Sequence, residues 1–318
     1  MSRKDTPSDV LMDTSDYRTP FENWEKEAWA RKGPPIKMEF APGLKYFSPS
    51  ISPLFTHNLV SSADEDTRDR LLILSLHTYL EFTVRLEMGP VNKVANLLTE
   101  PAFLPWLPQA MKEDAFLVYF DESLHAEESK RLAVAVRRET GIDRAPVTPA
   151  FLRKLDELIE IEEYELHPLV KLFFVIISET LITGSLSFLP KDKSVQMPVR
   201  EVTDRHARDE SRHHGYFKTV FHFVWPRLPA PVQQLVGILL PEMVWAFLAP
   251  DRGAMEAMLN TIELRQTTSQ IVENILASAR TLATIKKSAA PTLVMFNDAG
   301  VLNDKRVREA FRLRGLID

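Results

Sequence analysis

The pattern Asp-Glu-Ser-x-His occurs twice in this chain, as DESLH at positions 121–125 and as DESRH at positions 209–213. A glutamate and a histidine three residues apart lie on one face of an α-helix, because three steps nearly complete a turn. Two such pairs on two packed helices can hold two metal ions between them. The repeated motif therefore predicts a helical fold organised around a buried metal centre.

Each motif also has an upstream glutamate that lies within an apolar stretch. Glu87 precedes Glu122 by 35 residues, and Glu179 precedes Glu210 by 31 residues. Glu179 stands inside the stretch FFVIISETLI, where an unpartnered carboxylate would be costly to bury. Glu81 follows a similar apolar turn, and we prefer Glu87 as the ligand. One glutamate from each of two helices, with a Glu-x-x-His pair from each of two others, is the ligand set of di-iron proteins built on a ferritin-like bundle.

Four carboxylates suit a pair of iron ions because the charges balance. Two ferrous ions carry four positive charges, which four glutamates cancel, so an apolar core is left with no large net charge. Iron that reacts with oxygen also prefers oxygen and imidazole donors and open coordination positions. We expect Glu122 and Glu210 to bridge the two ions. The remaining residues complete one ion each, as the pairs Glu87 with His125 and Glu179 with His213.

A further histidine shares the helical stripe of the second motif. His206 precedes Glu210 by four residues and His213 by seven, and these steps place all three on one narrow face. We expect His206 to be an additional nitrogen ligand on the ion held by His213. That arrangement would leave the other ion, beside His125, as the more open position for oxygen.

The aspartate at the start of each motif is expected outside the ligand set. Asp121 and Asp209 point about a quarter turn away from the adjacent glutamate, towards a neighbouring helix. Each is placed to accept the free ring N–H of a ligand histidine, which would fix the orientation of that ring. The alternative for either residue is an ordinary surface aspartate.

Composition favours an all-helical fold and excludes several classes of site. Only 10 of the 318 residues are glycine, which favours helix over a turn-rich β fold. The chain contains no cysteine, so it has no disulfide, zinc–thiolate site or iron–sulfur cluster, and this fits a reducing cytoplasm. The net charge is −5 with both signs interspersed, and no basic block indicates nucleic acid binding.

We expect a proline-rich arm followed by one helical domain. Seven prolines between positions 7 and 53 break any long helix there, so residues 1–60 should wrap over the bundle. Residues 61–318 should form a single ferritin-like domain with additional C-terminal helices. The expected helices cover 66–98, with a bend near Gly89-Pro90, then 112–140, 149–164, 168–189 and 198–224, followed by two or three helices over 230–289 and a basic amphipathic helix over 303–314.

The stretch 172–190 looks the most membrane-like in the sequence. It carries Glu179 near its middle, and a carboxylate exposed to lipid at that depth would be costly. The first residues are polar and lack the apolar core of a signal peptide. We therefore expect this stretch to be a buried helix of a soluble, cytoplasmic protein with no membrane and no nucleic acid partner.

The spacing of these residues resembles the p-aminobenzoate N-oxygenase family of non-haem di-iron enzymes. The pattern of that family has seven protein ligands, including an additional histidine that generic ferritins and most di-iron oxygenases lack. Each ligand finds a match within about residues 60–225 of this chain, namely Glu87, Glu122, His125, Glu179, His206, Glu210 and His213.

The resemblance implies a ferritin-like monooxygenase that is commonly homodimeric. Such an oxidoreductase takes electrons from an external donor, such as a reductase, a ferredoxin or a chemical reductant. It binds dioxygen at two iron ions (Fe2+/Fe3+) to give a peroxo-diferric species, which oxidises an amino nitrogen to hydroxylamine, nitroso or nitro. Family members usually serve secondary metabolite biosynthesis, and their substrates are small aryl amines or, in relatives, aliphatic amines.

The substrate is expected beside the ligands, in a space that excludes water. Tyr79, two turns before Glu87, is a candidate to face a polar group of the substrate. No arginine can be assigned from the sequence as an anchor for a carboxylate. The side chains one turn from the ligands are candidates to line the space, although each has a plain alternative as core: Thr83, Leu86, Val118, Thr183, Leu186 and Val202.

Other functions of a di-iron fold stay open at this point. A ribonucleotide reductase small subunit needs a redox tyrosine about four residues after the first motif histidine, where this chain has Ser129, with Tyr119 as the nearby substitute. A C-hydroxylase or desaturase is disfavoured by the additional histidine. An iron-storage ferritin would need a shorter, shell-forming bundle. A protein that kept the fold without metal would bury four carboxylates that repel one another.

Overall fold

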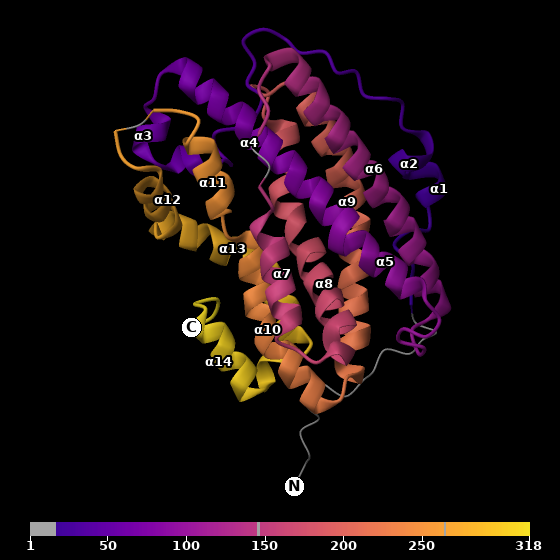
Figure 1. Cartoon of the computed structure of the whole chain (residues 1–318). Helices are drawn as coiled ribbons and strands as arrows, with labels where there is room; N and C mark the ends of the chain where they lie inside the picture. Colours follow the sequence, from indigo (N-terminus) through magenta and orange to yellow (C-terminus); the bar gives the residue numbers. More distant parts are fainter. Residues whose placement is uncertain (1–16, 145–146, 264) are drawn as a thin grey trace.

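The computed structural model of the chain describes residues 17–144, 147–263 and 265–318, apart from the side chains of residues 183–185. Within these residues the protein is all α-helical, and the predicted fold class is confirmed (Figure 1). No strand forms in the described part of the chain, where a single isolated bridge joins Lys45 to Val195. The fold is therefore a helical assembly in which side chains from several helices share one interior.

Four long helices form the centre of the molecule (Figure 1): α4 (Glu65–Leu86), α6 (Gln109–Thr140), α8 (His167–Leu186) and α9 (Met197–Val224). Helix α4 packs on α6, α6 packs on α9, and α9 packs on α8. This is the ferritin-like arrangement that the ligand pattern requires. The predicted ends of α6, α8 and α9 fall within three residues of the observed ones, and the helix predicted over 66–98 is divided into α4 and α5 (Asn92–Thr99).

The predicted bend near Gly89-Pro90 is also confirmed. Helix α4 passes through one wider, π-helical turn (Glu87–Val91) and continues as α5 (Asn92–Thr99). Gly89 leaves helical geometry, with φ −90° and ψ −105°. Pro90 has no N–H to donate, and its ring clashes with the preceding turn, so the helix widens there. The wide turn begins at Glu87, and turns of this kind are frequent at functional sites.

Local sequence explains where the long helices begin and end. Asp64 caps α4, because its side chain accepts a hydrogen bond from the backbone N–H of Thr67 at 2.9 Å. Helices α8 and α9 carry Pro168 and Pro198 in their first turns, where no N–H is needed. Helix α6 ends at Gly141, whose φ of +70° is the left-handed conformation that glycine adopts readily.

The remaining helices surround one end and one side of this centre. They are α7 (Ala150–Glu160), α10 (Ala230–Leu248), α11 (Arg252–Leu259), α12 (Thr268–Leu276), α13 (Ala279–Asp298) and α14 (Lys305–Leu313). The prediction of two or three helices over 230–289 was wrong, since four begin there. Asp251, Thr267 and Ser278 each cap a new helix through the side chain, and these caps divide the segment. The amphipathic tail helix is confirmed as α14, which packs on α10.

The described part of the N-terminal arm lies on the bundle. It contains two four-residue helices, α1 (Trp24–Glu27) and α2 (Trp29–Lys32), which lie beside α6 in Figure 1. Phe21, Trp24 and Phe47 are buried. A 3-10 turn (Pro53–Thr56) and α3 (Asn58–Ser61) lead from the arm into α4. The buried aromatic rings explain why a proline-rich segment packs on the bundle rather than extending into solvent.

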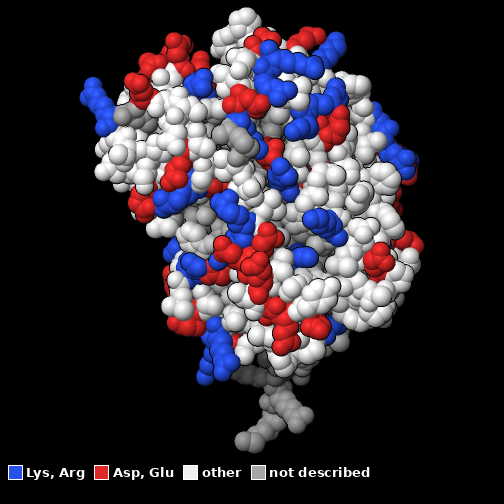
Figure 2. Space-filling view, viewed as in Figure 1, with Lys and Arg blue, Asp and Glu red and all other residues white. Residues whose placement is uncertain are grey.

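The most apolar segments lie in and around the helical core. The middle of α8 is fully buried, from Leu172 to Ile177. Among the described residues, one stretch, Ala230–Leu259, is long and apolar enough to cross a membrane by length and composition alone. Its first part, α10, packs on α8 and α14. Figure 2 shows acidic and basic side chains interspersed over the visible face.

Candidate metal centre

Seven candidate donors come together between the four long helices. The turn after α4 supplies Glu87, α8 supplies Glu179, and α6 and α9 supply the rest. None is more than 3% exposed. The members from α6 are Glu122 and His125, and those from α9 are His206, Glu210 and His213. A set of ionisable side chains this deeply buried requires compensating charge.

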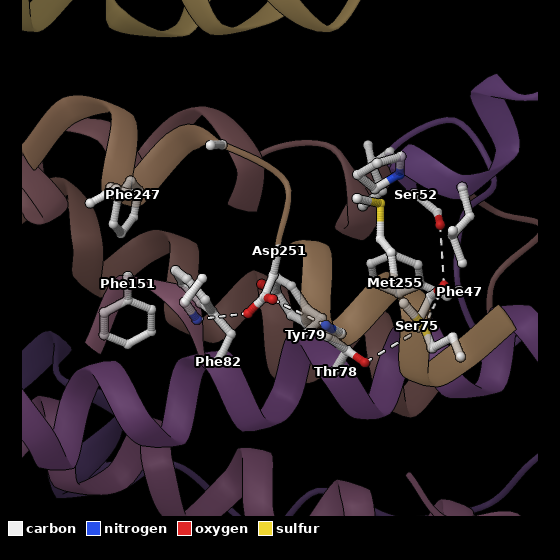
Figure 3. Close-up of a pocket in the computed structure, with 18 residues that line it drawn as sticks. Phe47, Ser52, Ser75, Thr78, Tyr79, Phe82, Phe151, Phe247, Asp251 and Met255 are labelled. Atoms are coloured by element: carbon white, nitrogen blue, oxygen red, sulfur yellow. Dashed lines mark hydrogen bonds between the residues drawn. The ribbon is translucent and has the colours of Figure 1, made fainter. Parts of the chain in front are cut away.

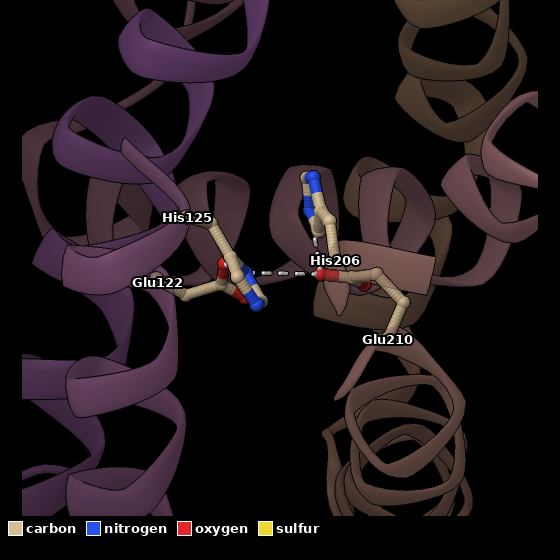
Figure 4. A group of neighbouring side chains, drawn as sticks. All are labelled: Glu122, His125, His206 and Glu210. Atoms are coloured by element: carbon tan, nitrogen blue, oxygen red, sulfur yellow. Dashed lines mark hydrogen bonds and ion pairs between the residues drawn. The ribbon is translucent and has the colours of Figure 1, made fainter. Parts of the chain in front are cut away.

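Six of the seven candidates form two groups, in each of which the donor atoms lie within 4.8 Å of one another, and Glu87 lies outside both groups. Both groups contain Glu122 and Glu210, so these two carboxylates stand between them. Figure 4 shows two side chains from α6 pointing towards two from α9 in one of the groups. That group adds His125 and His206 to the shared glutamates, and the other adds Glu179 and His213.

The two oxygens of Glu122 face different histidines. Its Oε2 lies 2.8 Å from Nδ1 of His125, and its Oε1 lies 2.7 Å from Nδ1 of His213. Nδ1 of His213 is also 3.2 Å from Oε1 of Glu210. A carboxylate whose two oxygens serve two separate donor groups has the geometry needed to bridge two cations.

The assignment of His206 to the ion beside His213 stays a prediction, and the structure places the His206 side chain in the group that contains His125. Its ring lies 4.1 Å from that of His125, centroid to centroid, and its Nε2 lies 3.5 Å from Oε1 of Glu87. The reason is axial position: His206 stands one turn before Glu210, whereas His213 stands one turn after it. Two histidines on the same face of α9 can therefore lie at opposite ends of the site. Glu87, His125 and His206 lie on one side of the shared glutamates, and Glu179 and His213 lie on the other.

The aspartate of each motif faces the histidine of the other motif. Oδ2 of Asp121 lies 3.3 Å from Nε2 of His213, and Oδ2 of Asp209 lies 3.2 Å from Nε2 of His125. Both aspartates are fully buried. Each of these histidines thus directs Nδ1 towards the glutamates and Nε2 towards an aspartate, so its orientation is held from both ends.

Two further residues of this outer layer escaped the sequence analysis. Nε1 of Trp24, in the N-terminal arm, donates to both oxygens of Asp121 at 3.0 and 2.9 Å. The guanidinium of Arg212 contacts Asp209 and lies 3.6 Å from Asp121. Arg212 occupies the variable position of the second motif, and this position was the sequence feature from which its contact with Asp209 could have been predicted. For Trp24 the sequence held no signal, because 97 residues separate it from Asp121.

The charges within the site favour opposite protonation states for different carboxyl groups. Burial raises the pKa of Glu87 and Glu179 well above the ordinary value, and the neighbouring glutamates add to this. Burial acts in the same direction on Glu210, but the charge of His213 and hydrogen bonds from the histidines hold its pKa at about 2. Burial lowers the pKa of His125, but its carboxylate partners outweigh this and raise it to about 10.

The donor set fits a pair of cations. Both oxygens of Glu87 and both oxygens of Glu179 are buried without a hydrogen-bond partner among the described residues. Buried polar atoms are otherwise almost always paired, so four unpartnered oxygens around two histidine groups indicate missing positive charge. Divalent cations that prefer oxygen and imidazole ligands would pair with these atoms. They would also keep Glu87 and Glu179 ionised, despite the raised pKa of each.

The candidates for the substrate pocket fall into two sets. Tyr79 lines a cavity of about 200 Å³ whose wall contains none of the seven candidate donors. Thr83 is buried, and the side chain of Thr183 lies outside the described residues. The others are buried within hydrophobic clusters and do not line that cavity: Leu86, Val118, Leu186 and Val202.

The positions considered for a redox tyrosine differ in their surroundings. Ser129 is buried, and Tyr119 is 40% exposed on the surface of α6. A tyrosine that reduces or oxidises a buried metal pair must lie close to it, and an exposed side chain does not. The geometry therefore disfavours a ribonucleotide reductase role for Tyr119.

Comparison with known proteins agrees with this geometry. A family model described as p-aminobenzoate N-oxygenase AurF matches residues 16–300 of the chain. A 4-aminobenzoate N-oxygenase from Streptomyces thioluteus is 22% identical over 218 residues, which make up 68% of this chain and 65% of that protein. The match therefore spans slightly less than two thirds of the relative's length.

Proposed function

Since the chain belongs to the p-aminobenzoate N-oxygenase family, we propose that it is a di-iron N-oxygenase that oxidises the amino group of a small molecule with dioxygen. The observation that supports this most is the pair of donor groups that share Glu122 and Glu210. Bound iron supplies oxygen-activating redox chemistry in such an enzyme, with electrons from an external donor.

The proposed ligand assignment follows the distances between the donors. Glu122 and Glu210 would bridge the two ions, and the remaining donors would divide three to two. Asp121 and Asp209 would keep a proton on Nε2 of the opposite histidine, so that the lone pair of Nδ1 faces the ion. The ion on the first side would take Glu87, His125 and His206, and the ion on the second would take Glu179 and His213.

The chain would also prepare the amine for reaction. Oxidation at nitrogen needs its lone pair, and a site shielded from water favours the neutral amine over the ammonium ion. Burial, together with the negative charges of Glu87 and Glu210, raises the pKa of Tyr79. The Tyr79 hydroxyl therefore keeps its proton and is available as a hydrogen-bond donor beside the site.

Metal analysis combined with an amine assay tests this function. The purified protein should take up about two irons per chain and, with a reductant under oxygen, should convert one or more members of an aryl and aliphatic amine panel to N-oxidised products. Glu179→Ala and His213→Ala should lose both iron and turnover. Glu81→Ala is the matched control, because Glu81 lies on α4 and pairs with Arg85 and Arg144 outside the donor set. Full activity in the Glu179 and His213 variants would contradict the proposal.

We further propose that the protein works in the cytoplasm, as a homodimer, in the biosynthesis of a secondary metabolite. The support for a dimer is an exposed aromatic stripe on α6. Phe116, Tyr119 and Phe120 follow helical spacing and are 53%, 40% and 55% exposed. Clustered aromatic residues on a surface are typical of a protein–protein contact. Electrons would come from a reductase or ferredoxin, for which a chemical reductant can substitute in vitro.

A further inference from the structure

An apolar cavity of about 200 Å³ lies beside α4, where α7, the start of α11 and the N-terminal arm meet it. Figure 3 shows several of the aromatic rings that line it, with Tyr79 near the middle of the view. An apolar cavity of about 150 Å³ holds a benzene molecule, so this volume suits one substituted ring or a branched aliphatic chain. Its larger lining side chains are Phe47, Tyr79, Phe82, Phe151, Phe247 and Met255.

Tyr79 connects this cavity to the donor set. It stands two turns before Glu87 on the same face of α4, with Thr83 one turn from each. Its hydroxyl is buried and has no hydrogen-bond partner among the described residues. Burial, followed by the charges of Glu87 and Glu210, raises the pKa of this hydroxyl, so it keeps its proton. Through Tyr79, the cavity wall therefore shares a face of α4 with Glu87.

The other polar groups of the cavity are already engaged. Ser52 and Ser75 share a hydrogen bond of 3.1 Å between their hydroxyls, and Thr78 donates to the carbonyl of Leu74 at 2.9 Å. The carboxylate of Asp251 accepts from the backbone N–H groups of Ala150 and Ala254, at 2.7 and 3.0 Å. These bonds hold the cavity wall and leave the serines, Thr78 and Asp251 little capacity for a charged ligand.

No lysine, arginine or histidine is among the described residues that line this cavity. The nearby Arg144 lies beyond Thr78 and Met258, in a neighbouring small cavity, and pairs with Glu81 at 2.8 Å. The one ionisable acid in the wall, Asp251, carries the same sign as a carboxylate ligand. A benzoate or an amino acid carboxylate bound here would lose its water without gaining a cation, which is strongly unfavourable.

We propose that this cavity binds the substrate and selects amines that have no free carboxylate, so that the acid group is absent or masked as an ester, thioester or amide. The inference rests on the proposed N-oxygenase function. It also distinguishes this chain from its relative named for 4-aminobenzoate, which is an acid. The selectivity is a property of the cavity wall and is measurable as binding, apart from turnover.

Matched ligand pairs test the proposal on the full-length, iron-loaded protein by calorimetric titration. The pairs are 4-aminobenzoate with its methyl ester, and leucine with its methyl ester. At least one ester should bind. Its affinity should be at least about tenfold higher than that of the matching acid. Equal or tighter binding of both acids, or no binding of either ester, would overturn the proposal.

A charge placed in the wall gives the second arm of the test. Phe247 is partly exposed, and Phe247→Arg can keep an aliphatic stem in the cavity while adding a cation. This variant should bind 4-aminobenzoate at least about tenfold tighter than the parent, whereas the neutral control Phe247→Leu should not. An unchanged acid affinity in a folded Phe247→Arg protein would contradict the assigned position of the cavity.

Turnover is measured separately, so that the two proposals can fail independently. Esters that bind but are never oxidised at nitrogen would count against the N-oxygenase function and leave the selectivity intact. Faster N-oxidation of the free acids than of the esters would overturn the selectivity and leave the N-oxygenase function intact.

Discussion

At the scale of single residues, the buried carboxylates of the candidate donor set are a source of instability in the metal-free protein. Glu179 is fully buried, both its oxygens are unpartnered, and burial followed by the charges of Glu210 and Glu122 raises its pKa. An acid whose pKa is higher in the folded state than in the unfolded chain destabilises the folded state above the unfolded value of about 4.5. The destabilisation increases as the pH rises, until the pH exceeds the pKa of Glu179 in the folded protein.

Glu179→Gln should therefore stabilise the metal-free protein and weaken the metal-bound one. At pH 8 the metal-free variant should melt at a higher temperature than the parent, and the difference should shrink as the pH falls towards 4.5. In the presence of ferrous iron the order should reverse, because the variant loses a charged ligand. Thermal melts at several pH values, with and without iron, measure both effects. A variant that melts lower than the parent under all conditions would show that Glu179 has a purely structural role.

Trp24→Phe tests the outer layer around the ligands. The substitution keeps an aromatic ring but removes the N–H that both oxygens of Asp121 accept, so Asp121 would hold His213 less firmly. Loss of such an indirect partner typically lowers metal affinity by about 10- to 100-fold. Trp29→Phe is the control, since Trp29 lies in the same arm and packs against Arg205 instead. Equal iron affinity of the two variants, by competition with a chelator, would contradict this role.

The sequence predicted the donors better than it predicted their surroundings. Spacing along a helix identifies residues that share a face, and the seven candidates do converge. It did not reveal which end of the site His206 would reach, because that depends on the relative level of Glu122 and Glu210 on two antiparallel helices. Trp24 was not predictable either, since its partner lies on a helix that no local pattern connects to the arm.

At the scale of the helices, the boundaries follow local chemistry. Caps, prolines and a left-handed glycine stand at the ends of α4, α8, α9 and α6, and the sequence shows all of these signals. Where the prediction merged helices, between 230 and 289, the interruptions are side-chain caps at Asp251, Thr267 and Ser278. Serine, threonine and aspartate also occur inside helices, so their presence alone does not indicate a boundary.

Gly141→Ala should destabilise the end of α6 without affecting the metal centre. The φ of +70° at this position is unfavourable for a residue with a Cβ, at a cost of about 1 kcal/mol. Nothing lies within 4 Å of the added methyl group, so no clash contributes. Chemical denaturation should show this loss, with unchanged iron content. A drop in iron content would mean that the end of α6 and the donor set are coupled.

At the scale of the whole molecule, the arm and the surface decide how the bundle is covered. We predicted an arm over residues 1–60 and a single domain over 61–318, and this division stays a prediction. The described part of the arm supports it, because Phe21 packs 6.0 Å from the ring of His213 and Trp24 reaches Asp121. The sequence indicated only that the arm was apolar enough to pack, since the contacts involve residues about 100 or more positions away.

Phe116→Lys should convert the proposed homodimer to monomers. Phe116 is 53% exposed on α6, and a charge there would have to be buried in an interface that uses the aromatic stripe. Leu313→Lys is the control, because Leu313 is 79% exposed on α14. Light scattering after size-exclusion chromatography measures the mass of each. A monomeric parent protein, or a Phe116→Lys variant that stays dimeric, would rule out this surface as the dimer contact.

The paired cation site itself is tested most directly by a crystal structure of the iron-loaded protein, with anomalous diffraction recorded on both sides of the iron absorption edge. We expect two iron peaks about 3.5–4 Å apart. Both should contact Glu122 and Glu210, one on the side of His125 and His206, the other beside Glu179 and His213. A single peak, peaks elsewhere, or no anomalous signal between the four helices would contradict the site described here.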